Sequence, residues 1–150
     1  MRLPTTHLDR RTRMGFDLSA RNKDAGDFSM GAFSWSWMLE NGVGLPVGYG
    51  PGFAPAQFIY RARPDGLCIG YNDGARVTSA EAKQMAQVAR WLADYQDDLY
   101  AQWMKEPEEK RSQMENTGGR LYKLPVRRDF VDKVRGFAEW AEKSGGFRVY

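Results

Sequence analysis

The sequence predicts an α+β domain: a small, mostly antiparallel sheet of three or four strands with two main helices packed on one face. Apolar residues recur at three- and four-residue steps over 79–104 and 129–143, which is the spacing of amphipathic helices. Shorter segments alternate apolar and polar residues or lie between turn residues, as strands do. The length of 150 residues corresponds to one domain with a cooperative core.

The first predicted element is a strand over residues 14–20. Apolar and polar side chains alternate there, with Phe16 and Leu18 on one face, and this period of two is typical of a strand. The polar segment 22–26 ends in glycine and predicts a turn after the strand.

The aromatic segment 28–39 fits two patterns. Trp35 and Trp37 are two residues apart, which favours an extended chain. Phe33 and Trp37 are four apart, which favours a helix. We predict a short helix over 31–40 that ends at the Asn-Gly pair following it.

Residues 41–56 contain five glycines and three prolines. This density predicts a long irregular surface loop, and the sequence leaves open whether the loop is a lid or only a connection. Next along the chain, segments 57–63 and 66–71 flank Pro64 and Asp65. This arrangement predicts an antiparallel hairpin with a Pro-Asp-Gly turn.

The helix over 79–104 has a clear start signal. Thr78 and Glu81 are three apart, the spacing of a capping box, in which the hydroxyl accepts from the Glu81 amide and the carboxylate reaches back. Pro107 predicts that the helix ends before that residue.

The remaining third of the chain predicts one more helix and one more strand. Residues 105–120 are polar and predict either a connecting loop or a short polar helix. Asp129 is expected to cap the helix over 129–143, which ends at a Ser-Gly-Gly segment. Residues 147–150 are expected to return as an edge strand.

Charge divides the chain into two parts. Residues 1–13 hold four arginines and one aspartate, so residues 14–150 hold 18 basic and 18 acidic side chains. We therefore expect a basic, flexible tail at 1–13 and one domain at 14–150. A nucleic-acid-binding protein spreads Lys and Arg over a folded face, so the neutral domain supports nucleic acid only weakly as a partner.

Several kinds of chemistry are excluded by residue type. The single histidine, His7, lies in the tail, and the single cysteine, Cys68, lies in an apolar segment, so neither structural zinc nor a His-based catalytic pair is expected. Neither the phosphate-binding loop GxxxxGK(S/T) nor the dinucleotide-binding motif GxGxxG is present. We expect no cofactor, and we favour a non-enzymatic role. The lone cysteine and the lack of an apolar run of about 18–20 residues point to the cytoplasm and to no membrane.

Carboxylates remain as candidates for binding chemistry. Asp17, Asn72 and Asp73 would converge at one end of the sheet if their strands were neighbours, and could then bind a small ligand or a hard cation. The alternative is that Asn72 and Asp73 serve only a turn, and we predict no metal. Trp35 and Trp37 are candidate stacking surfaces for the same ligand, or core residues.

A second set of candidates would bind a macromolecule. Residues 94–115 carry a balance of −4 and residues 120–135 a balance of +4. The two segments either face each other or the solvent within the fold, or form a basic patch for an acidic partner or nucleic acid. The candidate side chains are Tyr49, Phe53, Arg120, Lys123, Arg127 and Arg128.

Four stretches together resemble a family of small uncharacterised phage and bacterial proteins. These are Met14-Gly-Phe-Asp-Leu, the aromatic cluster with Trp35-Ser-Trp37, Tyr71-Asn-Asp-Gly74, and Phe137-Ala-Glu-Trp140 with Ser144-Gly-Gly-Phe147. The resemblance implies a phage or prophage origin and a host-takeover role. The leading hypothesis is a non-enzymatic interaction protein that binds a bacterial macromolecule, with a defence-system component as one candidate. The alternative is a small-molecule-binding domain or carboxylate-based enzyme with its site at the end of the sheet.

Overall fold

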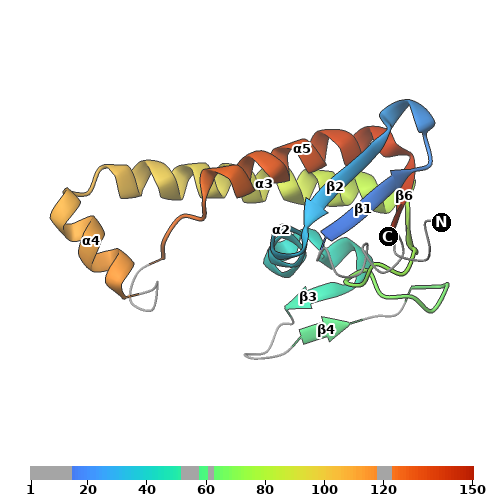
Figure 1. Ribbon diagram of the computed structural model, residues 1–150, viewed down its shortest axis with the longest axis horizontal. Coiled ribbons are helices and arrows are strands. Elements are labelled where there is room, and N and C mark those ends of the chain that lie inside the picture. The colour runs from blue at the N-terminus through green and yellow to red at the C-terminus, as the bar shows by residue number, and fades with distance from the viewer. Residues whose placement is uncertain (1–14, 52–57, 61–62, 118–122) are drawn as a thin grey trace, which may run out of the picture.

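The computed structural model describes residues 15–51, 58–60, 63–117 and 123–150, and its main feature is a four-stranded antiparallel sheet (Figure 1). The strands stand in the order β2-β1-β6-β5. Their bounds are β1 Gly15–Ala20, β2 Asp27–Gly31, β5 Ala75–Thr78 and β6 Gly146–Val149. The C-terminal strand was expected at the edge of the sheet, and this expectation is wrong. β6 lies between β1 and β5 and pairs antiparallel with both, so its backbone groups are hydrogen-bonded on each side.

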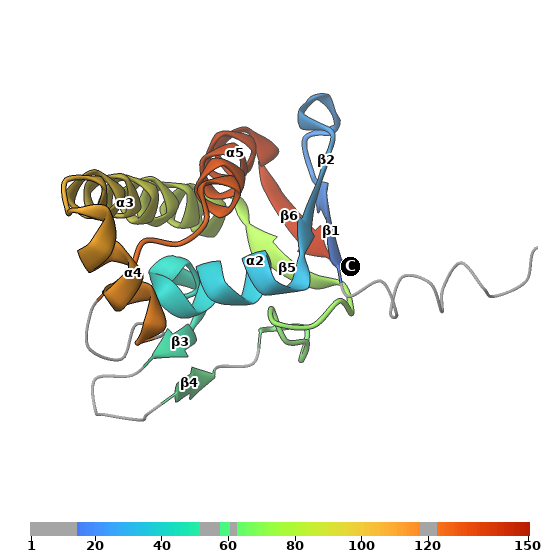
Figure 2. The same ribbon diagram turned by 60° about the vertical axis from the view of Figure 1, so that its left-hand side comes forward.

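Two long helices lie side by side on one face of this sheet (Figure 2). They are α3, Ser79–Met104, and α5, Arg128–Ser144. The predicted α+β fold with two main helices on one face is therefore confirmed. Two shorter helices are also present among the described residues, α2 Ala32–Met38 and α4 Glu108–Asn116. α4 is the short polar helix that was one of the two alternatives for residues 105–120.

The core lies between the sheet and the helices. Every second strand residue points inward, so that Leu18, Val77, Phe147 and Val149 are buried. Phe137 of α5 packs against the ring of Phe147 with 6.0 Å between ring centroids. Edge-to-face aromatic contacts of this kind add to the stabilisation from buried area.

The segment after α2 differs from the predicted surface loop. A helical turn, Leu39–Val43, is followed by a 3-10 turn, Leu45–Val47, and by strand β3, Tyr49–Pro51. Val43 and Val47 are fully buried. The glycines permit this because they allow close turns: a side chain at Gly44 would lie 2.2 Å from the Tyr49 carbonyl oxygen. Residues 52–57 of the predicted loop lie outside the described residues.

The predicted hairpin is only partly correct. Its turn is present, since the Gly66 amide donates to the Arg63 carbonyl at 2.7 Å. The strand before the turn, β4 Phe58–Tyr60, pairs instead with β3. Residues 66–71 form bends and turns and not a strand, since the Tyr71 amide donates to the Cys68 carbonyl at 3.1 Å within the segment itself.

Strand β2 was not predicted. Its Phe28 and Met30 alternate with polar residues and face the core, but this alternation runs directly into the helical spacing of the segment that follows. The cap predicted for α5 is also wrong. The helix begins one residue earlier, and Asp129 accepts hydrogen bonds from the Arg127 side chain at 2.8 and 3.1 Å. Asp129 thus lies in the first turn, where a negative charge favours the helix dipole.

The capping box of α3 is confirmed in both directions. The Glu81 amide donates to Thr78 Oγ1 at 3.2 Å, and the Thr78 amide donates to Glu81 Oε1 at 3.0 Å. We expect Thr78→Ala to lower the free energy of unfolding by about 1 kcal/mol, because one amide at the start of the helix loses its partner. Urea denaturation measures the change. Thr78→Ser keeps the hydroxyl and should stay close to the unaltered protein, and an alanine variant of full stability would contradict the assignment.

Within the described residues, no helix is both long enough and apolar enough to cross a membrane.

Candidate functional site

The sheet has a second face, opposite the helices, that no described element covers. Alternation places Ser19, Arg76, Thr78 and Arg148 on this open face, while the strand residues between them point into the core. An antiparallel sheet commonly leaves one face in water. What sets this face apart is the kind of side chain that it carries.

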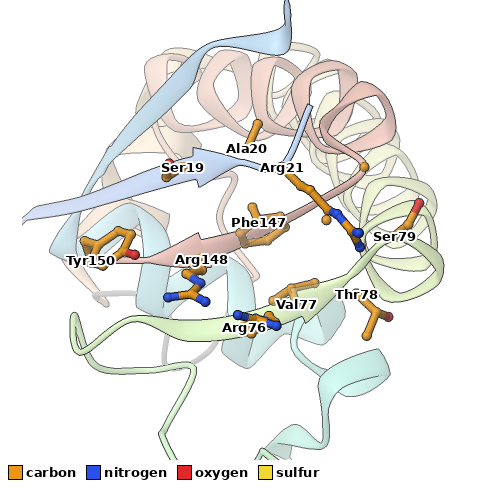
Figure 3. Close-up of a pocket in the computed structure, with 12 residues that line it drawn as sticks. Ser19, Ala20, Arg21, Arg76, Val77, Thr78, Ser79, Phe147, Arg148 and Tyr150 are labelled. Carbon is orange, nitrogen blue, oxygen red and sulfur yellow. The ribbon is translucent and has the colours of Figure 1, made fainter. Parts of the chain in front are cut away.

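Three arginines gather on the open face (Figure 3). Arg76 of β5 and Arg148 of β6 are direct partners in the register, which puts their Cβ atoms about 4.5–5.5 Å apart. Arg21 follows β1 directly, and its amide donates to the Gly146 carbonyl at 2.8 Å. All three side chains are exposed, and none makes an ion pair with a described residue.

These arginines line a shallow cavity of about 640 Å³, which we call the arginine hollow. Two glycines, Gly145 and Gly146, form part of its wall and add no side chain that could fill it. Gly146 is required there, since its φ is +98° and an added Cβ would lie 2.7 Å from the Val77 carbonyl oxygen. Ser19, Thr78, Ser79 and Tyr150 also line the hollow.

Every charged side chain among the described residues that line the hollow is an arginine, and therefore positive. Like charges directly opposite each other on neighbouring strands destabilise a sheet, and guanidinium groups stay protonated at any physiological pH. Arg76 and Arg148 are such a pair. The arginine hollow therefore holds a repulsion that an anion placed between the two guanidiniums would relieve.

The predicted site at Asp17, Asn72 and Asp73 is divided by a strand. Asp17 and Tyr150 exchange two backbone hydrogen bonds of 2.8 Å, and the Gly74 amide donates to the Val149 carbonyl at 2.6 Å. The acidic residues thus reach the same end of the sheet, but β6 lies between β1 and β5, so their strands are not neighbours as convergence required.

The two aspartates line different cavities. Asp17 borders one beside Gly31 and Lys133, and its Oδ1 accepts from Ser29 Oγ at 3.0 Å. Asp73 borders a second one, of about 530 Å³, that shares Arg76 and other residues with the arginine hollow. Asn72 lies next to Asp73 in the same bend and is half-buried.

The two tryptophans proposed as ligand surfaces contact other parts of the fold. Trp35 has an exposed fraction of 0%, and its Nε1 donates to the Ile69 carbonyl at 3.1 Å. Its ring has no face turned to solvent. Trp37 is half-buried, with its ring 6.4 Å from that of Phe130.

Arginines of the proposed basic patch form ion pairs with carboxylates of the same chain. Arg128 pairs with Asp97 and lies over the ring of Tyr100 at 4.6 Å. Arg127 pairs with Asp129 at 2.8 Å. A macromolecule at these residues would therefore compete with intramolecular partners.

The remaining members of that candidate set are placed as follows. Lys123 Nζ lies 5.5 Å from the centre of the Tyr95 ring, a cation–π contact. Tyr49 is half-buried, with its hydroxyl against the backbone of Gly70. Phe53 and Arg120 lie outside the described residues.

The acidic and basic segments do face each other across the α3–α5 contact. Arg135 of α5 pairs with Asp94 at 3.0 Å and with Asp97, both of α3. The hydrogen bond from Arg128 has the largest effect on the Asp97 carboxyl and, with Arg135, holds the pKa below its ordinary 3.8 although burial opposes this. Asp97 and Arg135, whose pKa values are both shifted, form an ion pair between α3 and α5.

Glu81 is held in the same way at the start of α3. Burial alone would raise the pKa of its carboxyl, but hydrogen bonds from Arg63 and the Thr78 backbone outweigh burial and hold it below 4.5. A carboxyl with a lowered folded-state pKa stabilises the fold above its ordinary pKa and loses that contribution as the pH falls.

We therefore expect the free energy of unfolding to decrease as the pH falls below 4.5, toward the lower folded-state pKa of Glu81. Thermal denaturation between pH 3 and pH 7 measures this. Glu81→Gln removes one titrating group and should make the decrease shallower. An identical pH profile in the variant and the unaltered protein would show that Glu81 plays no part.

Comparison of the chain with protein-family models, curated proteins and solved structures finds no match. Among the described residues, no group of three or more His, Cys, Asp or Glu side chains is placed to hold a metal ion. The open face with its arginine hollow is the surface on which a function can be argued from geometry.

Proposed function

We propose that this chain is a non-enzymatic interaction protein that binds a bacterial macromolecule through the open face of its four-stranded sheet. The single observation that carries the proposal is the set of three exposed arginines, Arg21, Arg76 and Arg148, without ion-pair partners among the described residues. Arginine and tyrosine are enriched at protein interfaces, and Tyr150 lies beside Arg148 (Figure 3).

The face carries both signs of charge, which suits a protein partner. Asp17 and Asp27 project from β1 and β2, while Arg76 and Arg148 project from β5 and β6. A partner with the complementary pattern would bind in one orientation, since like charges brought together are costly. A nucleic acid offers only negative charge and would be repelled by the acidic half.

A binding role is also supported by where the shifted ionisable groups lie. Catalytic groups have perturbed pKa values and line clefts. Among the residues that the structure describes, the groups with shifted pKa values are Glu81, Asp97 and Arg135, and each forms an ion pair within the fold. Their shifts are explained by structural ion pairs.

The resemblance to small phage and bacterial proteins supplies the setting of this proposal. From it we propose a phage or prophage origin and a defence-system component among the candidate partners, and we propose the bacterial cytoplasm as the site of action. A second candidate function, small-molecule binding at the end of the sheet, is favoured by the cavity beside Asp73 that adjoins the arginine hollow.

Capture of partners from bacterial lysate at low salt tests the proposal. Arg76→Gln/Arg148→Gln removes two charges from the open face, and Lys105→Gln/Lys110→Gln removes two from the distant end of α3 and α4 (Figure 1). We expect the first pair of substitutions to abolish capture and the second to leave it unchanged. Equal capture by both variants would mean that the open face is not the binding surface.

A further inference from the structure

We infer that the arginine hollow is a binding site for a compact polyphosphate anion, either free or as the polyphosphate group of a nucleotide. This goes beyond the proposed function, because it assigns a small ligand to the open face and needs no macromolecular partner. The hollow measures about 640 Å³, within the usual range of small-molecule sites.

Arg76 and Arg148 form one end of the site. Their guanidiniums project from directly paired positions on β5 and β6. A planar guanidinium donates two parallel hydrogen bonds to a phosphate. A phosphate group between them would be held by both and would offset the repulsion between the two guanidiniums.

Arg21 and the start of α3 form the other end. Figure 3 shows the Arg21 side chain extending toward Thr78 and Ser79, where α3 begins. Thr78 and Ser79, where the 26-residue helix α3 begins, line the hollow, so the positive end of the helix dipole lies at its edge. A second phosphate group there would meet one guanidinium and a favourable helix end.

The carboxylates around the arginine hollow favour a compact anion over an extended one. Asp17 and Asp27 stand on the same face over the neighbouring strands β1 and β2, and Asp73 borders the adjoining cavity. The positive surface is therefore bounded by carboxylates on two sides. An extended nucleic-acid backbone needs a continuous basic path, whereas two or three linked phosphates fit between the acidic borders.

Two glycines in the wall of the hollow leave space for a ligand because they carry no side chains. Gly145 and Gly146 line the hollow between the two basic ends. Both have positive φ, +70° and +98°, and they form the turn from α5 into β6. Gly145 is half-buried and Gly146 is buried, and neither position fills the hollow with a side chain.

Isothermal titration calorimetry of the full chain at low salt tests the inference. The probes are inorganic triphosphate, ATP, orthophosphate and a twelve-residue oligothymidylate. We expect triphosphate and ATP to bind, and Arg76→Gln or Arg148→Gln to weaken each by about tenfold or more, as expected for loss of a charge-assisted contact. Tighter binding of ATP than of triphosphate would identify a nucleotide, and equal binding the polyphosphate group alone.

Two controls separate binding from folding. Lys105→Gln/Lys110→Gln loses the same charge as the double arginine variant and should bind normally. Thermal denaturation without ligand should show Arg76→Gln/Arg148→Gln at least as stable as the unaltered chain, because a like-charge pair is gone. The inference is overturned if 1 mM triphosphate and ATP both give no heat, if the lysine control weakens equally, or if the oligonucleotide binds more tightly than either.

Discussion

Replacing Arg63 with methionine is expected to lower the free energy of unfolding by about 3–5 kcal/mol, the range for breaking a buried ion pair on one side. The Arg63 side chain is 6% exposed and pairs with Glu81, whose side chain is 20% exposed. Methionine fills much of the same volume, so most of the loss comes from the unpaired carboxylate and the unpaired carbonyls.

Three elements depend on this one guanidinium. Arg63 Nε donates to the Arg76 carbonyl at 3.2 Å in β5, one terminal nitrogen contacts the Val47 carbonyl at 3.5 Å, and the other pairs with Glu81 in the first turn of α3. The substitution therefore weakens the attachment of β5 and α3 to the turn before β3. Because Glu81 also completes the capping box, the start of α3 should be the first part to lose protection from hydrogen exchange.

Urea denaturation and hydrogen exchange measure these effects. Arg63→Lys keeps the charge but loses the forked geometry, so it should recover only part of the stability. Arg90→Met serves as the matched control, since Arg90 makes an exposed pair with Glu142 and exposed pairs contribute about 0–1 kcal/mol. If Arg63→Met costs no more than Arg90→Met, the buried pair is not a principal support of the fold.

The parts of the fold that sequence predicted well are those set by local rules. Thr78 and Glu81 lie within one turn of each other, and the apolar stripe of α3 is continuous, so helix and cap follow from the chain itself. Long-range pairing does not follow in this way. That β4 pairs with β3, and that β6 lies inside the sheet, depends on which backbones meet after collapse.

The candidate site shows the same division. Arg76 and Arg148 each lie between two buried apolar residues, so the outward direction of each side chain was accessible from the sequence. Their meeting was not, because it requires β5 and β6 to be neighbours. The balance of 18 basic and 18 acidic residues over 14–150 also conceals a local cluster, since a sum contains no information on position.

Replacing Trp35 with alanine is expected to destabilise the protein by about 3–5 kcal/mol, as large-to-small substitutions of fully buried aromatic residues do. Its ring lies 5.8 Å from that of Phe137 and 5.9 Å from that of Phe16. The loss includes the hydrogen bond from Nε1 to the Ile69 carbonyl, which leaves a buried acceptor without its donor.

Two further variants separate a core role of Trp35 from a role in binding. Trp35→Phe keeps most of the ring and should lose about 1–3 kcal/mol, the effect of one unsatisfied buried group. Trp37→Ala alters the half-buried neighbour and should cost less than Trp35→Ala, because a smaller cavity forms. Since Trp35 is closed off from solvent and does not line the arginine hollow, folded Trp35→Phe should bind triphosphate as the unaltered chain does. A variant that keeps its stability but loses binding would place Trp35 at the ligand and not in the core.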